Sequence, residues 1–376
     1  MSLPQDRRIR SIDLIRGAVM VLMAIDHVRV FAGVPAGGTT PGVFFTRWVT
    51  HFCAPAFVFL AGTSAYLYRQ THTDLSRFLV TRGAWLIVLE LTFLRLAWTF
   101  NLDFAHYMLA GVIWVIGWSM IALALLTKLP MRAVAAFGLV IVFGHNLLDG
   151  TINDSASAIW KILYVGFWAG PVGPLTILYS LIPWVGVMAL GYSFGPIVTR
   201  PPARRDRLCL AIGLGAIVLF LMLRGFNLYG EPRPWSSERV PAFLSFLNTT
   251  KYPASLQFLL MTLGPTIALI PAMERLEGPI AAFLETFGRV PFFFYLLHIP
   301  LIHVLAIVVS MIRMGTISPW LFANHPSGNG PPPDGYMWSL QLLYFVWAIA
   351  ILILYFACRW FARVKRTRSD WWLRYI

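Results

Sequence analysis

The sequence predicts an all-α protein, a polytopic bundle of about ten transmembrane helices. Of its 376 residues, 58% are hydrophobic and only 12% are charged, whereas soluble domains carry about 25% charged residues. A water-soluble fold of this length could not remove so much apolar surface from water, so lipid is the expected solvent. The 15 Trp residues suit anchoring at the two membrane interfaces.

Ten apolar runs are long enough to cross a hydrocarbon core of about 30 Å as helices. The fifth run is short, and Glu90 and Arg95 interrupt the third. The runs cover residues 12–32, 45–68, 78–100, 107–127, 131–148, 174–198, 208–225, 253–273, 290–313 and 338–362. Residues 1–376 are predicted to form a single transmembrane domain, which ends in a basic and aromatic cytoplasmic tail at 363–376.

The distribution of basic residues predicts the orientation. Loops on one side of the ten runs hold 19 of the 30 Lys and Arg residues, and loops on the other side hold nine. Because cytoplasmic loops are enriched in Lys and Arg, both termini are predicted to lie in the cytoplasm. We therefore expect a multi-pass protein of a bacterial inner membrane.

The formal net charge of +14 would indicate a nucleic-acid partner in a soluble protein. Here the basic residues gather in short loops and in the tail, so membrane lipids with anionic headgroups are the expected partner and nucleic acid is not. Cys53, Cys209 and Cys358 are far apart in the sequence and form no Cys-x-x-Cys pair. We predict that they are buried thiols rather than partners in a disulfide.

Ionisable side chains inside a bilayer are costly and therefore mark functional sites, and the first apolar run carries several. Arg16 and His27 are 11 residues apart, about three helical turns, so both project from nearly the same face about 16 Å apart along the axis. Asp13 lies close to that face, and Asp26 lies about 100° from His27. Arg29 points away and is expected at the interface.

Two interpretations of this helix stay open. In the functional one, the shared face presents a permanent cation, Arg16, towards the cytoplasm and a titratable base, His27, towards the outside. In the structural one, Asp13 and Arg16 form an ion pair at the i, i+3 spacing, and His27 hydrogen-bonds to a buried carbonyl.

Histidines on other runs are expected at a depth similar to that of His27. His51 lies about six residues into the second run, one turn after Arg47 on the same face. In the ninth run, His298 and His303 differ by about 140° in direction, so only one of them is expected to face the centre.

The fifth run closes on the outer side with His145 and Asp149, one turn apart. We expect a cluster in the outer half of the bundle formed by His27, His51, His145 and His298. A base that works near neutral pH suits histidine. The sequence contains no His-Glu-x-x-His or His-x3-His pair, so no metal site is predicted.

Stretches of the sequence resemble known acyltransferases. The opening RSIDLIRGAVMVLMAIDH is similar to the first helix of the acyltransferases that modify bacterial surface sugars, in which an Arg and a His separated by ten residues mark this helix; Arg16 and His27 match. Four later stretches resemble more closely the catalytic domain of heparan-α-glucosaminide N-acetyltransferase and its bacterial relatives: RWVTHFCAPAFVFLAGTSAYLY, GHNLLDG, KYPASLQFLLMTLGP and GRVPFFFYLLHIPLIH.

The resemblance implies an enzyme that moves an acetyl or other short acyl group from cytoplasmic acyl-CoA to a sugar or glycan acceptor across the membrane. Acyl-CoA is a co-substrate, and no further cofactor is implied. Arg16 would face the CoA side, where it pairs with a phosphate or polarises the thioester carbonyl. His27 would act on the acceptor as a base, with His51 and Asp26 orienting it. The expected substrate-binding residues are Arg47, His145, Asp149 and His298.

The chain departs from the eukaryotic lumenal enzyme, which carries its catalytic His in the first outer loop. Residues 34–44 contain no His here, and the position of His27 is an Asn in that enzyme. The base is therefore either His27 or His51, and the acceptor group is either a hydroxyl or an amine. A transporter or proton-coupled carrier is the alternative function, because buried ionisable groups also serve as relays.

Overall fold

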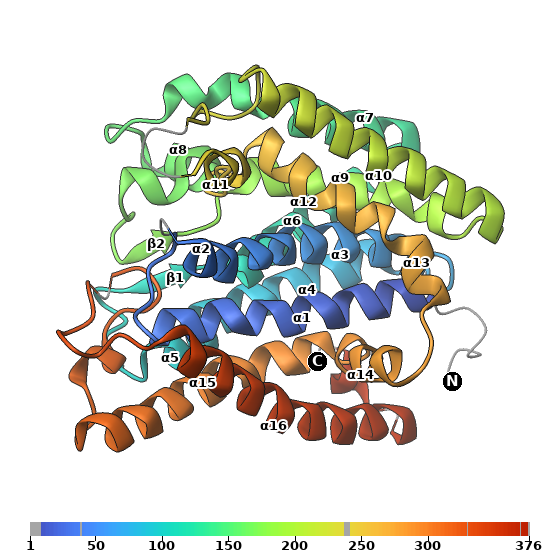
Figure 1. Cartoon of the computed structure of the whole chain (residues 1–376). Helices are drawn as coiled ribbons and strands as arrows, with labels where there is room; N and C mark the ends of the chain where they lie inside the picture. The colour runs from blue at the N-terminus through green and yellow to red at the C-terminus, as the bar shows by residue number, and fades with distance from the viewer. Residues whose placement is uncertain (1–8, 38–39, 237–240, 329, 369, 375–376) are drawn as a thin grey trace. The chain divides into compact units, whose positions relative to one another are not determined.

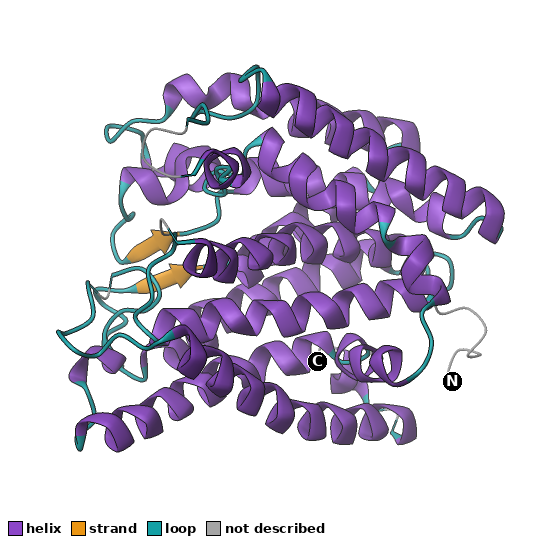
Figure 2. Ribbon diagram, viewed as in Figure 1, coloured by secondary structure: helices purple, strands orange, loops and turns teal. Residues whose placement is uncertain are grey.

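The computed structural model describes residues 9–37, 40–236, 241–328, 330–368 and 370–374. Helices make up most of this part of the chain (Figure 1), and Figure 2 shows one pair of short strands among them. The predicted all-α polytopic helix bundle is confirmed.

A helical segment lies in each of the ten predicted runs, but the runs 107–127 and 174–198 are helical only from Val112 and from Leu181, because residues 108–110 and 175–177 form strands. The helical segments are α1 (Arg10–Phe31), α2 to α3 (Pro41–Arg69), α4 to α5 (Leu75–Thr99), α6 (Val112–Leu126), α7 with the 3-10 helix after it (Met131–Thr151), α9 (Leu181–Val198), α10 (Pro202–Gly225), α12 to α13 (Leu256–Arg275), α15 (Pro291–Met314) and α16 (Leu340–Thr367). Seven of these segments are long and apolar enough to cross a membrane.

The three other segments differ from those seven for identifiable reasons. The 22 residues of α1 include Asp13, Arg16, Asp26 and Arg29, which lower its hydropathy. Helix α6 has only 15 residues, or about 22 Å of helix. Between α4 (Leu75–Leu89) and α5 (Arg95–Thr99) the chain forms a π-helix, Glu90–Leu94.

The π-helix lies where the two charged residues interrupt the third apolar run, and both charges have partners. The Glu90 carboxylate accepts hydrogen bonds from the backbone N–H groups of Ile113 and Trp114, at 2.9 and 3.3 Å, at the start of α6. Arg95 is fully buried and donates to Thr99 Oγ1 at 3.0 Å and to Asn101 Oδ1 at 2.8 Å. These contacts let two ionisable groups lie inside an apolar segment.

By its contacts the chain divides into two compact units, one formed by residues 1–53, 93–102 and 272–376 and the other by residues 54–92 and 103–271. In the first unit, α1 packs against α14 (Pro279–Gly288), α15 and α16 (Figure 1). A Cβ atom on Gly17 would lie 1.9 Å from the Leu284 carbonyl oxygen, and one on Gly288 would lie 1.8 Å from that of Asp13. Only glycine allows α1 and α14 to cross this closely.

In the second unit, α3 (Cys53–Arg69) packs against α9, α4 against α6, α7 against α9, and α10 against α12. Gly191 of α9 is pressed against the Phe59 carbonyl, and Thr63 Oγ1 donates to the Gly191 carbonyl oxygen at 3.0 Å. Strands β1 (Met108–Ala110) and β2 (Leu175–Ile177) pair in parallel. Two short helices, α8 (Ala158–Trp160) and α11 (Ala242–Leu247), lie in the connections of this unit.

The three cysteines are buried, and the C-terminal tail begins as a continuation of α16. Cys53, Cys209 and Cys358 are buried free thiols, as predicted. Helix α16 continues to Thr367, so the predicted tail begins as its last turn. A 3-10 helix, Trp371–Arg374, follows, and Leu373 in it is buried; Tyr375 and Ile376 lie outside the described residues.

The orientation remains a prediction, and reporter fusions test it. Fusions at residues 70, 129 and 200 and at the C-terminus should report a cytoplasmic location, because the loops on that side carry most of the Lys and Arg residues. Fusions at residues 36, 154, 234 and 328 should report an external one. Alkaline phosphatase and a fluorescent protein, active on opposite sides of a bacterial inner membrane, provide complementary signals. An external C-terminus would reverse the sidedness proposed below.

Candidate active site

Two histidines that are far apart in the sequence meet in the first unit. His27 lies near the C-terminal end of α1, and His298 lies in the third turn of α15. Their ring planes are inclined at 24° with centroids 4.8 Å apart, and Nδ1 of His27 lies 2.6 Å from Nε2 of His298, so the rings meet edge to edge. That separation is a hydrogen bond, so one nitrogen donates and the other accepts.

Backbone carbonyls determine which nitrogen of each ring carries a proton. His298 Nδ1 lies 2.7 Å from the carbonyl oxygen of Tyr295 and 3.2 Å from that of Phe294. Because a carbonyl oxygen only accepts, Nδ1 is the protonated nitrogen of a neutral His298, and its Nε2 is an acceptor. The proton in the contact between the rings therefore belongs to His27 Nδ1. The Nε2 of a neutral His27 then carries the lone pair that a general base requires.

Aromatic side chains surround the pair. Trp98, on α5, presents its edge to His27 with ring centroids 4.9 Å apart, and Phe294 stacks on His298 at 5.3 Å. His298 is fully buried, whereas His27 is partly exposed. The buried ring is thus held by Phe294 on one face and by its backbone bonds, and the ring that carries the lone pair is the more accessible one.

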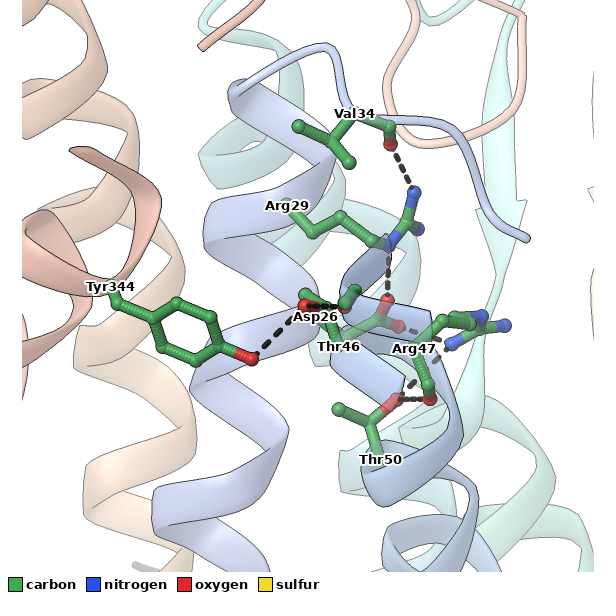
Figure 3. Close-up of polar contacts among 8 residues, drawn as sticks. Asp26, Arg29, Val34, Thr46, Arg47, Thr50 and Tyr344 are labelled. Atoms are coloured by element: carbon green, nitrogen blue, oxygen red, sulfur yellow. Dashed lines mark hydrogen bonds and ion pairs between the residues drawn. The ribbon is translucent and has the colours of Figure 1, made fainter. Parts of the chain in front are cut away.

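Asp26 belongs to a second cluster, beside His27 in the chain (Figure 3). Its carboxylate accepts from Arg29 Nε at 2.7 Å, and it forms a short ion pair with Arg47 of α2 (Pro41–Trp48). Arg29 also donates to the Val34 carbonyl oxygen at 2.6 Å. Thr50 donates to the Arg47 carbonyl oxygen at 2.7 Å. One carboxylate therefore joins α1, α2 and the loop after α1.

Arg29 is buried within the protein, with 7% of it exposed, and its expected place at the membrane interface stays a prediction. The i, i+3 spacing to Asp26 and the Val34 carbonyl provide partners that allow its burial. The hydroxyl groups of Thr46, on α2, and Tyr344 lie 3.0 Å apart and link this helix to α16 (Figure 3). The cluster thus fixes the position of α2 against α1.

At the other end of α1, Arg16 forms the ion pair that the structural interpretation predicts. Arg16 Nη1 lies 3.6 Å from Asp13 Oδ1, and 20% of the Arg16 side chain is exposed. A guanidinium group carries five N–H donors, so this pair does not use its whole hydrogen-bonding capacity. Pairing with Asp13 and contact with a ligand are compatible at this position.

The remaining predicted site residues lie in different places. His51 is buried in the 3-10 helix Val49–Phe52 of the first unit. His145 belongs to the second unit, where Nδ1 lies 2.9 Å from the Ile141 carbonyl oxygen and Nε2 lies 2.7 Å from that of Ala254. Asp149, also in the second unit, accepts from Asn146 Nδ2 at 2.9 Å and from the Tyr164 hydroxyl at 2.5 Å. A catalytic role for His51 and a substrate-binding role for His145 and Asp149 stay predictions.

Sequence reasoning named His303 but not the aromatic side chains around it, and it did not single out His325. His303 is packed between Phe31 and Phe100, at 4.5 and 3.9 Å, and hydrogen-bonds to the Ala97 carbonyl oxygen at 3.1 Å. His325 packs against Phe31 from the Gly- and Pro-rich loop before α16. Burial lowers the pKa of His325 to about 4, so the ring is neutral at physiological pH. The helical period of α15 does not predict the contacts of His303, and His325 lies in a loop with no helical period. Both residues make their contacts with segments that are distant in the chain.

The donor set does not indicate a metal. Within the part of the chain that the structure describes, no group of three His, Cys, Asp or Glu side chains is arranged to hold an ion. The His27–His298 separation of 2.6 Å is also that of a direct hydrogen bond rather than of two ligands on one metal. The pair is therefore suited to proton transfer, in which a buried neutral imidazole orients a second, more accessible imidazole.

Comparison with known proteins identifies the family of this chain. Residues 8–229, more than half of the chain, match the family described as heparan-alpha-glucosaminide N-acetyltransferase, catalytic. A search among curated proteins found no match. The matched residues include α1 with Arg16 and His27, the segment with Arg47 and His51, and the helices up to the end of α10. The chain is an integral, multi-pass membrane protein that belongs to the heparan-alpha-glucosaminide N-acetyltransferase catalytic family, a family of membrane acetyltransferases.

Proposed function

We propose that this protein transfers an acetyl or other short acyl group from cytoplasmic acyl-CoA to a hydroxyl or amine of a sugar or glycan on the outer side of a bacterial inner membrane. The observation that carries the proposal is the hydrogen bond between His27 and His298, in which the proton pattern leaves a lone pair on His27 Nε2. The family match supports the acetyl-transfer chemistry.

The proposed step is base-assisted attack on a thioester. The acceptor oxygen or nitrogen forms a bond to the thioester carbonyl carbon while His27 Nε2 removes its proton. The carbon–sulfur bond then breaks, and the proton on His27 passes to the leaving thiolate, which yields free CoA and restores the base. During the step His27 is an imidazolium whose Nδ1–H stays bonded to His298. That hydrogen bond to the buried ring stabilises the charged form.

Other residues are assigned by position. Arg16 stands about 16 Å along α1 from His27, which suits contact with the extended donor rather than with the acceptor. Asp26, held by Arg29 and Arg47, fixes α2 and thereby the segment that leads to His51. We assign acceptor binding in the first unit to Arg47, on the predicted outer side; the same role for His145 and Asp149 of the second unit rests on the sequence alone.

Transfer of labelled acetyl groups tests the function directly. Membranes that contain the protein receive acetyl-CoA labelled in the acetyl group, and lipid-linked and soluble glycans are then separated and counted. We expect label in a glycan fraction only when the active chain is present. Uptake or release of an unmodified solute by proteoliposomes, with no labelled product, would favour the carrier function instead.

Arg16 variants are expected to affect use of the donor. Arg16→Lys keeps the charge but loses the planar fork, so the KM for acyl-CoA should rise, and Arg16→Ala should raise it more. The KM for the acceptor should change little in both variants. Steady-state kinetics with each substrate varied in turn provides the measurement. Arg289→Ala is the matched control, because it also removes an arginine that is paired with a carboxylate on its own helical segment, Glu285 at 2.6 Å.

Arg16 would be a structural partner of Asp13 alone if both variants folded and used acyl-CoA normally. In that case thermal unfolding should show a lower midpoint for Arg16→Ala, with unchanged KM values. The same pair of variants thus separates the functional interpretation of α1 from the structural one.

A further inference from the structure

A pocket of about 560 Å³ opens in the second unit, away from the histidine pair in the sequence. It lies between the C-terminal end of α3 and the first turn of α4, with one wall from the end of α6. In the predicted orientation these three helix ends face the cytoplasm. The residues that line it are mostly polar: Arg69, His72, Thr73, Asp74, Leu75, Ser76, Arg77 and Thr127.

Two arginines give the pocket its charge. Neither Arg69 nor Arg77 forms an ion pair with a carboxylate of the described residues, and both side chains are exposed. The Arg69 guanidinium is nevertheless fixed in place, because its Nη1 donates to the Tyr192 hydroxyl at 2.8 Å. An arginine that is held by a neutral partner keeps its charge and most of its donors for a ligand.

Asp74 is the one acidic residue of the lining, and its carboxylate is hydrogen-bonded to Tyr68. Asp74 precedes the first turn of α4, a position from which a carboxylate usually caps a helix, but it makes no such cap. Its Oδ1 accepts instead from the Tyr68 hydroxyl at 3.0 Å. The first three N–H groups of α4 therefore lack an acceptor within the helix, and they add to the positive potential at this end.

The walls of the pocket are fixed by side chains that contact one another. The hydroxyls of Ser76 and Thr127 both donate to the Ala124 carbonyl oxygen, at 3.2 and 3.0 Å, and so join α4 to α6. The His72 ring stacks on Tyr68 at a centroid distance of 3.9 Å and an angle of 10°. Fixed walls, two arginines and a helix N-terminus are the features of an anion site.

We propose that this pocket binds a phosphate group of a phosphorylated ligand. Arg69 and Arg77 would bind the phosphate oxygens through their planar forks, and the first turn of α4 would add backbone N–H donors. The volume leaves room for more than the phosphate alone, so the ligand is a phosphate ester rather than the free ion.

Two sources have this chemistry. One is the nucleotide end of acyl-CoA, which carries three phosphate groups; this source rests on the proposed function. The other is the headgroup of an anionic phospholipid in the cytoplasmic leaflet. The pocket is at the end of the apolar segment Pro41–Arg69, a depth that either ligand reaches.

Direct binding to the purified full-length protein in neutral detergent or nanodiscs tests the proposal. The soluble probe is adenosine 3′,5′-bisphosphate, with adenosine as the phosphate-free control. The lipid arm measures the affinity of the protein for phosphatidylglycerol in nanodiscs, with phosphatidylcholine nanodiscs as the control. The variants are Arg69→Gln, Arg77→Gln and the double variant. Arg132→Gln is the matched control, because it removes an exposed arginine from the same predicted side that does not line the pocket.

We expect one of the two phosphate sources to lose about tenfold or more in affinity in the double variant, as for loss of charge-assisted hydrogen bonds, while Arg132→Gln leaves it unchanged. If the double variant loses affinity for adenosine 3′,5′-bisphosphate, the ligand is the nucleotide end of acyl-CoA. If it loses affinity for phosphatidylglycerol alone, the ligand is the lipid headgroup. Equal binding of both probes by the double variant and by the unaltered protein would overturn the site. Neither arm measures acyl transfer. A negative binding result therefore leaves the proposed transferase function untouched, and an absence of transfer leaves the phosphate site untouched.

Discussion

Replacement of His27 by alanine is expected to reduce acyl transfer by roughly 10²–10⁴-fold, the usual contribution of a positioned general base. The variant loses the Nε2 lone pair that the hydrogen bond to His298 places on that nitrogen. Binding of acyl-CoA should be retained, because Arg16 lies about three helical turns away. Initial rates of transfer from labelled acetyl-CoA and equilibrium binding of the donor, both on folded protein in detergent, provide the measurement.

His27→Asn makes the test sharper. The amide nitrogen of asparagine occupies a place close to that of Nδ1, so it can still donate to His298, but the variant has no base in place of Nε2. Equal loss in His27→Asn and His27→Ala would show that the base is needed and not only the contact between the helices. His106→Ala is a suitable control, because the His106 side chain is 81% exposed and pairs with Asp103 on the surface.

The competing assignment makes the opposite prediction. If His51 is the base, His27→Asn should retain transfer and His51→Ala should lose it. Normal transfer by both His27→Asn and His51→Ala would refute a catalytic role for either histidine. The carrier function would then be the better account of the buried groups.

Replacement of His298 by phenylalanine is expected to lower kcat on the order of 10²-fold. Phenylalanine keeps an aromatic ring between Phe294 and His27 but offers no acceptor to His27 Nδ1–H, so neutral His27 is free to carry its proton on either nitrogen. Loss of a charged orienting group costs a serine protease roughly 10⁴-fold. A neutral imidazole should contribute less than that.

His298 acts through His27, so its test needs a measurement that a structural role would not change. His298→Gln keeps an acceptor near the position of Nε2 and should recover part of kcat, with the KM for acyl-CoA unchanged in both variants. Thermal unfolding controls for folding. The positioning role is excluded if both variants lose the same fraction of activity, or if activity follows the unfolding midpoint instead of the acceptor.

Several features of this protein follow from local sequence. The apolar runs, the excess of basic residues on alternate loops and the burial of the cysteines depend on composition over 20 or so residues, and the helices form where these runs predict them. The common face of Arg16 and His27 follows from the 3.6-residue period alone. The interruption of the third run by Glu90 likewise marks the π-helix that begins there.

Contacts between residues that are distant in the chain cannot be predicted from local sequence. His27 and His298 are 271 residues apart, and their contact depends on how α1 and α15 pack and on the rotamers that this packing allows. The periodicity of α15 predicts only that His298 and His303 point in different directions. Packing selects His298 for His27 and places His303 between Phe31 and Phe100.

Burial of charge shows the same division. From the sequence, Arg29 is a cation at the end of a helix; in the structure it is buried, because Asp26 and the Val34 carbonyl satisfy it. Whether an ionisable group can leave water depends on the donors and acceptors that other segments bring to it. The sequence by itself therefore determined the membrane-embedded helical fold, the family and the residues capable of acid–base chemistry. Only the tertiary structure decided which of those residues meet, because hydrogen-bond partners are set by the packing of helices distant in the chain.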